Sequence, residues 1–455
     1  MSMRLFDSAA GQLREFAPAN PDLVTMYVCG PTVYGQPHVG NARAVVAFDV
    51  LYRLLRSRFA KVRYARNITD IDDKIIAAAG QAQVEVDEWA RQCAVWFHEV
   101  MEQLGTLVPD LQPRATEHID TMIAMIEKLV AAGNAYVADG HVLFEVASYP
   151  AYGSLSNRSR DEMIAGARVE VAPYKRSPED FVLWKPSRPE QPGWESPWGR
   201  GRPGWHIECS AMVKECLGET IDIHGGGNDL LFPHHENESA QSCCANGCEQ
   251  LARFWVHNGQ VTAGGRKMAK SAGNFFTVKD VLQEYPGEVI RYALLSSHYR
   301  RPLEWGEGLL AQSKASLDRL YRSLASAGQP AADAEPAAEL LAALADDLNT
   351  PQAFAVLHEL AARANRAGSG QAAAAGELLA SGRFLGLLES DPAAWLQESA
   401  TGGGMAAAEI EQLIGKREQA RSRGDYETAD RIRQQLDDAG VAVEDGAGGS
   451  SWRRR

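Results

Sequence analysis

The chain has 455 residues, of which 45% are hydrophobic and 23% are charged. This ordinary globular composition excludes a collagen-like or wholly disordered chain, and the length predicts roughly two to four domains. The formal net charge of -13 argues against a protein that coats DNA, although a local basic patch could still bind nucleic acid. We find neither a membrane-spanning apolar run nor a signal-peptide pattern, so we expect a cytoplasmic protein with no membrane partner.

The first segments of the chain have the pattern of a nucleotide-binding fold. Residues 23–29 form a short apolar run that predicts a buried strand, and Gly30-Pro31 ends it. Apolar residues at helical spacing follow from Val45 to Leu55, and residues 61–68 predict a second strand. A strand, a helix and a strand within about 45 residues is the length of a βαβ unit. The pattern predicts an α/β class with a parallel sheet that binds ligands at the carboxyl ends of its strands.

The remaining sequence predicts an insertion and then a helical region. Helical patterning at 119–130, a short strand at 141–146 and a Pro-, Trp- and Arg-rich stretch at 185–203 precede a strand at 219–224, where the sheet resumes. A new helix is expected to begin near Asn349-Thr350-Pro351. We therefore expect a Rossmann-like domain in two halves (1–107 and 203–262), an insertion (108–202), a loop and junction (263–305), a helical bundle (306–390), a linker (391–406) and a small C-terminal unit (407–455).

The segment from residue 37 to 41 lies between the first strand and the first helix. The N–H groups at a helix N-terminus attract anions, and Gly40 lets a ligand approach the backbone closely. His38 and Asn41 could donate hydrogen bonds to a phosphate. On these residues alone, an ordinary polar turn remains an equally simple interpretation.

A second motif is the glycine-flanked basic loop at residues 264–271. Lys267 and Lys270 make this loop cationic, and such a loop can stabilise the charge that develops on a transferring phosphate. The loop lacks the spacing of a P-loop. Taken alone, it would also fit a solvated basic loop.

The third motif is rich in histidine and spans residues 224–238. His234 and Glu238 are four residues apart, so on a helix they share a face and could supply two metal ligands. A zinc-protease motif is excluded, because the position of its second histidine is occupied by Ser239.

Cysteines could complete this site if the metal is zinc. The chain has seven, an odd number that, without a signal peptide, favours metal ligands or buried thiols over disulfides. Cys29 ends the first strand, where the ligand crevice of such a sheet opens. Local spacing leaves two choices open: Cys29 with Cys209, or the cluster of Cys243, Cys244 and Cys248.

Together these motifs resemble the class I aminoacyl-tRNA synthetases and, in detail, the cysteinyl-tRNA synthetase family. Pro-His-Val-Gly-Asn resembles the HIGH signature and Lys-Met-Ala-Lys-Ser the KMSKS loop, about 230 residues apart. Residues 27–34, 67–74, 204–212 and 224–241 carry the finer resemblance, which extends over nearly the whole chain. Asn41 and Ala269 depart from the usual His and Ser of the two signatures.

The resemblance implies an enzyme that activates L-cysteine with ATP to cysteinyl-adenylate and transfers it to the 3′ end of cysteine tRNA. It also implies one Zn²⁺ per chain that selects the substrate thiolate, Mg²⁺ with ATP, and no editing domain; a monomer is our default expectation. The implied site residues are Cys29, Cys209, His234 and Glu238 for the metal; His38, Asn41, Lys267 and Lys270 for catalysis; His38, Gly40, Asn41, Asp229 and Lys270 for ATP; Cys29, Thr69, Trp205 and His234 for the substrate; and Arg417, Arg421, Arg431 and Trp452 for tRNA.

Three other classes of function were weighed against this interpretation. The ligase of mycothiol synthesis, which joins cysteine to an amino sugar, resembles the same catalytic half but lacks the C-terminal unit that ends in Trp452-Arg453-Arg454. A simple nucleotidyltransferase leaves the four implied metal ligands unexplained. A non-catalytic zinc-binding or tRNA-binding module would not explain the two nucleotide-binding signatures at residues 37–41 and 267–271.

Overall fold

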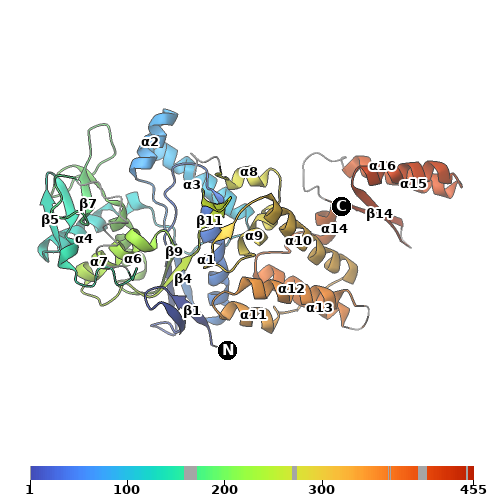
Figure 1. Ribbon diagram of the computed structural model, residues 1–455, viewed down its shortest axis with the longest axis horizontal. Helices are drawn as coiled ribbons and strands as arrows, with labels where there is room; N and C mark the ends of the chain where they lie inside the picture. The colour runs from blue at the N-terminus through green and yellow to red at the C-terminus, as the bar shows by residue number, and fades with distance from the viewer. Residues whose placement is uncertain are drawn as a thin grey trace. The chain divides into compact units, whose positions relative to one another are not determined.

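The computed structural model describes residues 2–157, 172–268, 274–366, 368, 370–397, 407–446 and 449–454 (Figure 1). The chain forms two compact units. The first contains Met1–Val278, Ser297–Trp305 and Leu341–Pro351, and the second contains Lys279–Ser296, Gly306–Leu340 and Gln352–Arg455. Within the described ranges, every helix is too short or too polar to cross a bilayer.

A four-stranded parallel sheet lies at the centre of the first unit, in the order β10-β9-β3-β4. Its strands are β3 (Val24–Val28), β4 (Val62–Arg66), β9 (Ile221–Gly227) and β10 (Ala252–Asn258). Nearly all of their residues are buried, as parallel strands covered on both faces require. The predicted α/β class and parallel sheet are therefore confirmed, and both early strands lie where the apolar runs predict them.

Helix α1 (Val39–Arg58) connects β3 to β4. Its apolar positions, including Val45, Phe48 and Leu51, are buried, which explains the helical spacing seen in the sequence. The helix begins at His38, the N-cap residue, so its amino end lies directly after the carboxyl end of β3.

Residues 135–203 contribute a separate antiparallel sheet in the order β5-β6-β7-β8. Further short strands form a hairpin, β1 with β2, and a three-stranded sheet, β12-β11-β13. These strands are β5 (Ala135–Ala138), β6 (His141–Phe144), β7 (Phe181–Pro186), β8 (Gly201–Pro203), β1 (Arg4–Asp7), β2 (Gln12–Glu15), β11 (Val261–Ala263), β12 (Arg266–Lys267) and β13 (Leu303–Glu304).

Helices accompany these strands. They are α2 (Asp73–Ala82), α3 (Val86–Gln103), η1 (Ala115–Glu117), α4 (Ile119–Ala131), η2 (Val146–Ser148), α6 (Trp205–Leu217), η3 (Leu231–His235), α7 (Glu236–Asn246) and α8 (Val278–Leu282). Residues of α4, α6 and α7 share one apolar core with the ends of β3 and β9, which includes Met122, Met212 and Ala240.

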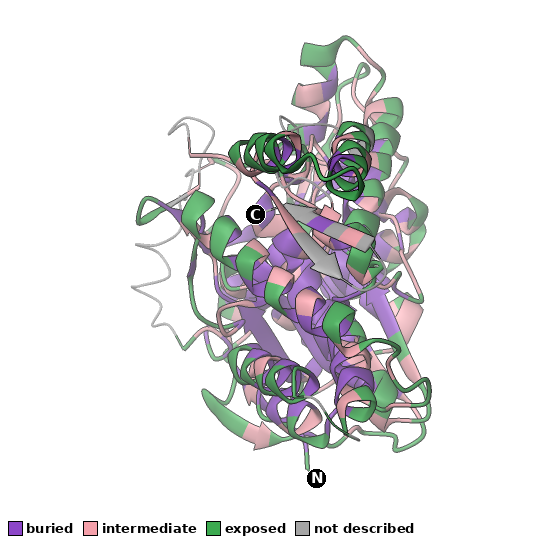
Figure 2. Cartoon of the chain, turned by 90° about the vertical axis from the view of Figure 1, so that its right-hand side faces the viewer, coloured by how far each residue is buried: buried purple, intermediate pink, exposed green. Residues whose placement is uncertain are grey.

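The rest of the described chain is mainly helical. It contains α9 (Gly287–Leu295), α10 (Glu307–Ala327), α11 (Ala338–Ala345), α12 (Thr350–Ala364), α13 (Gln371–Phe384) and α14 (Pro392–Gln397). Helix α12 begins at Thr350, as the sequence predicts. Figure 2 shows buried residues concentrated on the strands and on inner helix faces, with exposed residues on the outer faces.

A small hairpin of two helices and two strands ends the chain. It contains α15 (Ala407–Ser422), α16 (Tyr426–Asp438), β14 (Val441–Gly446) and β15 (Gly449–Arg454). Its apolar core has six buried members: Ile410, Ile414, Ile432, Leu436, Val441 and Trp452. We call residues 407–454 the C-terminal hairpin.

Candidate active site

A cavity of about 290 Å³ opens where the parallel strands of the first unit end. Cys29 follows β3, Asp229 follows β9 and Gly259 follows β10, and all three line this cavity. Such a crevice at the carboxyl ends of parallel strands is where α/β sheets bind ligands. The predicted residues His38, Gly40, Asn41 and Trp205 line the same cavity.

The start of α1 is fixed by its own side chains. His38 Nδ1 accepts hydrogen bonds from the N–H groups of Gly40 and Asn41, at 3.1 and 3.3 Å. Asn41 Oδ1 in turn accepts from the His38 N–H at 3.1 Å, which completes a capping box. A Cβ atom at residue 40 would lie 2.9 Å from the His38 ring, so this position needs glycine. The motif thus has a structural role that the sequence did not reveal.

Backbone hydrogen bonds join the two signature segments. The Val39 N–H donates to the Phe276 carbonyl at 3.1 Å, and the Val278 N–H donates to the Pro37 carbonyl at 2.9 Å. Met268 and the Phe275 ring line the cavity beside His38. The backbone of Lys267 belongs to β12, whereas Ala269 and Lys270 lie outside the described residues.

Four of the predicted residues bring candidate metal-binding atoms together. Atoms of Cys29, Cys209, His234 and Glu238 all lie within 4.8 Å of one another, and all four residues are buried. Cys29 Sγ is 3.7 Å from Cys209 Sγ and 3.2 Å from Glu238 Oε1, and His234 Nε2 is 2.9 Å from the same carboxylate oxygen. We call this set the metal cluster. Two sulfurs, an imidazole and a carboxylate are a donor set that fits zinc.

The metal cluster is assembled from four different elements. Cys29 follows β3, Cys209 lies in α6, His234 lies in η3 and Glu238 lies in the first turn of α7. The spacing of four residues does place His234 and Glu238 on one face. Among the described residues, the candidate ligand groups contain none of the alternative cysteines Cys243, Cys244 and Cys248.

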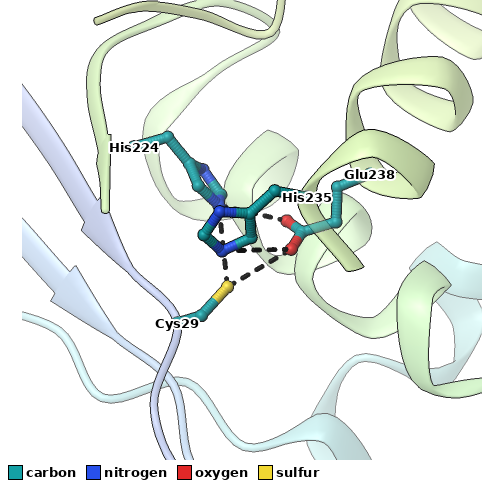
Figure 3. A group of neighbouring side chains, drawn as sticks. All are labelled: Cys29, His224, His235 and Glu238. Atoms are coloured by element: carbon teal, nitrogen blue, oxygen red, sulfur yellow. Dashed lines mark hydrogen bonds and ion pairs between the residues drawn. The ribbon is translucent and has the colours of Figure 1, made fainter. Parts of the chain in front are cut away.

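Two histidines that sequence reasoning missed form a second candidate set with Cys29 and Glu238 (Figure 3). His224 Nε2 is 3.6 Å from Cys29 Sγ and 3.3 Å from Glu238 Oε2, and His235 Nε2 is 4.0 Å from Glu238 Oε1. Zinc also accepts two imidazoles, one sulfur and a carboxylate, so the donor types alone fit either set, and only the first set contains the two cysteines that the family resemblance implies. Trp205 lines the cavity and stacks on His234, with ring centres 4.2 Å apart, whereas both added histidines are fully buried.

The four members of the metal cluster divide into two that favour the deprotonated form and two that favour the protonated form. A hydrogen bond from Cys29 lowers the pKa of the Cys209 thiol to about 6, although burial opposes this. Burial alone would raise the pKa of Glu238, but His224 and His234 outweigh it and lower that pKa well below the usual value. Burial likewise opposes the shift of His234, whose pKa rises to about 10 because Glu238 and Cys209 lie beside it. Burial, together with Cys209 and Glu238, raises the pKa of the Cys29 thiol well above its usual value, so Cys29 and His234 keep their protons while Cys209 and Glu238 lose theirs.

Further histidines contact both candidate ligand sets, His206 at His234 and His257 at His235. His206 Nδ1 lies 2.9 Å from His234 Nδ1, and His235 Nδ1 lies 2.8 Å from His257 Nε2. The chain of contacts ends at Ser8, whose Oγ is 2.8 Å from His257 Nδ1. Burial lowers the pKa of both His206 and His257 to about 3, so these rings are neutral. Such outer contacts orient ligands, and they join residues too distant in sequence for any spacing to reveal.

Trp205 and Thr69, two of the four predicted substrate residues, occupy different positions. Trp205 is 38% exposed and lines the cavity. Thr69 is 1% exposed and is not among the described residues that line it. Its hydroxyl accepts from Asn67 Nδ2 and donates to Glu208 Oε2, both at 3.1 Å.

The predicted tRNA residues of the C-terminal hairpin also divide into two groups. Arg421 and Arg431 are exposed. Arg417 is 4% exposed and donates to Ser450 Oγ at 3.2 Å, and Trp452 is 7% exposed within the apolar core. The burial of Arg417 and Trp452 favours a role in packing over a contact with tRNA.

Similar solved structures define the class of fold. They include methionyl-tRNA synthetase of Mycobacterium tuberculosis with methionyl-adenylate, at a TM-score of 0.55 and 17% identity, covering 87% of this chain and 94% of that one. LeuRS of Agrobacterium radiobacter, in a ternary complex with tRNA and LeuAMS, has a TM-score of 0.59 at 11% identity, covering 94% and 89%. The fold is that of the aminoacyl-tRNA synthetases.

Sequence comparisons narrow the class to one family. The model of the "tRNA synthetases class I (C) catalytic domain" matches residues 15–315, the "DALR domain" matches 340–389, and the "Cysteinyl-tRNA ligase anticodon binding domain" matches 405–453. Proteins named cysteine–tRNA ligase are 56% identical in Parvibaculum lavamentivorans and 53% identical in Xanthomonas campestris, each over 100% of this chain and 98% and 99% of the relative. The chain therefore belongs to the cysteine–tRNA ligase family, which confirms the resemblance drawn from its motifs.

Proposed function

We propose that the chain activates L-cysteine with ATP and transfers it to the 3′ end of cysteine tRNA. One observation carries this proposal: a single cavity is lined both by the start of α1 and by Cys29, a member of the buried metal cluster. The phosphate site and the thiol site that we propose would thus share one space. We expect the chain to act as a monomer in the cytoplasm.

In the first step, a carboxylate oxygen of cysteine attacks the α-phosphorus of ATP, and the bond to the pyrophosphate oxygen breaks. His38 Nδ1 accepts two backbone N–H groups, so Nε2 is the nitrogen that bears the proton and can donate to a phosphate oxygen. We propose that Asn41, Lys267 and Lys270 also stabilise the charge on phosphorus and on the departing pyrophosphate, with Mg²⁺. Gly40 would let the phosphates approach closely, and Asp229 would contact the ribose.

Cys29, Cys209, His234 and Glu238 would hold Zn²⁺. Bound there, zinc would favour the ionised thiol of cysteine over the hydroxyl of serine, because thiolate is the stronger zinc ligand. Trp205, stacked on His234, would cover the amino acid. Thr69 would act one layer further out, through its hydrogen bonds to Asn67 and Glu208.

In the second step, the 2′-hydroxyl of the terminal adenosine of tRNA attacks the acyl carbon, and AMP leaves. We propose that the C-terminal hairpin binds the anticodon region, with Arg421 and Arg431 contacting phosphates. Exposed arginines supply the salt-dependent attraction on which nucleic-acid binding relies.

Pyrophosphate exchange and tRNA charging test the proposal. The protein is assayed with cysteine and with serine, before and after chelation of zinc, and then with cysteine tRNA. We expect exchange that requires cysteine and zinc, followed by charging. Exchange without charging would favour a ligase that joins cysteine to an amino sugar, and the absence of exchange would refute the catalytic assignment.

A further inference from the structure

Part of the cavity lining has no role in binding ATP or cysteine in the proposed function. The nucleotide side contains His38 and Asp229, and the amino-acid side contains Cys29 and Trp205. The cavity lining also contains five residues to which the sequence assigned no role: Tyr34, Gln36, Arg66, Lys74 and Phe97. We call these five residues the third wall.

Arg66 is the most constrained member of the third wall. It ends β4, is 3% exposed, and its guanidinium carbon lies 5.3 Å from the centre of the Phe97 ring. Among the described residues, its buried Nε has no hydrogen-bond partner. An unmet N–H on a buried cation is unfavourable, and a phosphate oxygen is the partner that guanidinium geometry suits best.

Other members of the third wall add a second cation, an aromatic face and an acceptor. Lys74 Nζ lies 5.7 Å from the centre of the Tyr34 ring. The neighbouring carboxylate of Asp73 is already paired with Lys185 and Arg202, at 2.7 and 2.9 Å. The buried Oε1 of Gln36 has no hydrogen-bond partner in the described part of the chain, so this cavity-lining residue keeps an unmet acceptor. The cations suit a phosphate, the aromatic ring suits a base and the amide oxygen suits a ribose hydroxyl, so the third wall matches the three parts of a nucleotide.

We propose that the third wall holds the 3′-terminal nucleotide of tRNA during the second step. Arg66 and Lys74 bind its phosphate, the Tyr34 ring stacks on its base, and Gln36 Oε1 accepts from a ribose hydroxyl. The inference rests on the proposed function, because the third substrate must bring its 2′-hydroxyl to the acyl carbon from a side that the other two leave open. It assigns that side to named residues.

Binding of two tRNA species tests this assignment without catalysis. The zinc-loaded full chain is titrated with intact cysteine tRNA and with the same tRNA lacking its terminal nucleotide. We expect the wild-type protein to bind intact tRNA at least about fivefold more tightly, and Lys74→Ala to reduce this ratio toward one, because the lost contact exists only with the terminal phosphate. Lys61→Ala, an exposed lysine just before β4, is the matched control and should keep the wild-type ratio. An unchanged ratio in Lys74→Ala would overturn the proposal.

A kinetic comparison separates this inference from the proposed function. Arg66→Lys keeps the positive charge but removes the planar guanidinium, which can donate two parallel hydrogen bonds to a phosphate. We therefore expect the ratio of charging to pyrophosphate exchange to fall at least about tenfold. An equal fall in both activities would assign the third wall to ATP or cysteine instead, and overturn the inference. Wild-type protein that neither exchanges nor charges would refute the proposed function itself.

Discussion

The metal cluster and the C-terminal hairpin use polar side chains in opposite ways. In the metal cluster, four candidate ligand residues from separate segments of the chain are buried, with their candidate ligand atoms within 4.8 Å of one another. In the hairpin, six apolar side chains fill the interior, and the arginines proposed to contact tRNA are exposed. Selecting one atom of a small substrate needs fixed, short distances, whereas attracting a polyanion needs only accessible charge. Single substitutions should therefore have large effects in the first region and small effects in the second.

The largest effect is expected at the metal cluster. Cys209→Ala removes one of two sulfur ligands, so bound zinc should be lost and exchange with cysteine should fall at least about hundredfold. Zinc content by atomic emission and pyrophosphate exchange measure the two effects. Cys216→Ala, on the same helix but outside the cluster, is the control and should keep both. Full zinc content in Cys209→Ala would remove this residue from the ligand set.

The hairpin should be sensitive only in its core. Trp452→Ala empties the largest position of a six-residue core and should destabilise the hairpin by about 3–5 kcal/mol. Hydrogen exchange should show lost protection confined to residues 407–454, and charging should fall more than about tenfold while pyrophosphate exchange continues. Tyr426→Ala, at a side chain 66% exposed on α16, should change neither protection nor charging. Retained protection in Trp452→Ala would argue for a surface role of this ring.

A smaller effect is expected at the start of α1. Asn41→His restores the residue usual in the class, and an imidazole nitrogen can still accept from the His38 N–H. We expect exchange activity to stay within about tenfold of wild type. Steady-state exchange kinetics check this expectation, and a loss above about a hundredfold would show that histidine cannot replace Asn41 in capping the helix and stabilising the phosphate charge.

The smallest effects are expected at exposed arginines. Arg421→Gln and Arg431→Gln should each weaken tRNA binding only severalfold and reduce the slope of log affinity against log salt by roughly one. Titrations of tRNA at several salt concentrations measure this slope, with Lys61→Ala as the control. A loss of affinity that does not depend on salt would mean that the arginines act through something other than phosphate attraction.

Local patterns predicted what local forces decide. The apolar run of β3, the spacing along α1 and the common face of His234 and Glu238 all follow from the period of one element. The pairing of Cys29 with Cys209 does not, because 180 positions separate them and spacing could not exclude the other cysteines. That choice came from the family resemblance, and the fold then brought the two sulfurs together.

Other features depend on contacts between distant segments. The contacts from His235 through His257 to Ser8 join three distant parts of the chain, so the spacing of residues in the sequence could not predict them. The burial of Arg417 and Trp452 was missed because a basic or aromatic residue in a short terminal unit resembles a surface contact until its partners are known. The third wall was missed because the sequence pattern shows Arg66 only as the last residue of a strand and does not show that its side chain lines the cavity.

The hydrogen bonds between residues 37–39 and 276–278 have a consequence for synthesis of the chain. A growing polypeptide acquires the last member of the metal cluster once Glu238 has emerged from the ribosome. The two hydrogen bonds between residues 37–39 and 276–278 cannot form until Val278 has also emerged, 40 residues later. The backbone link between the two signature segments is therefore completed only after every residue of the metal cluster has been synthesised.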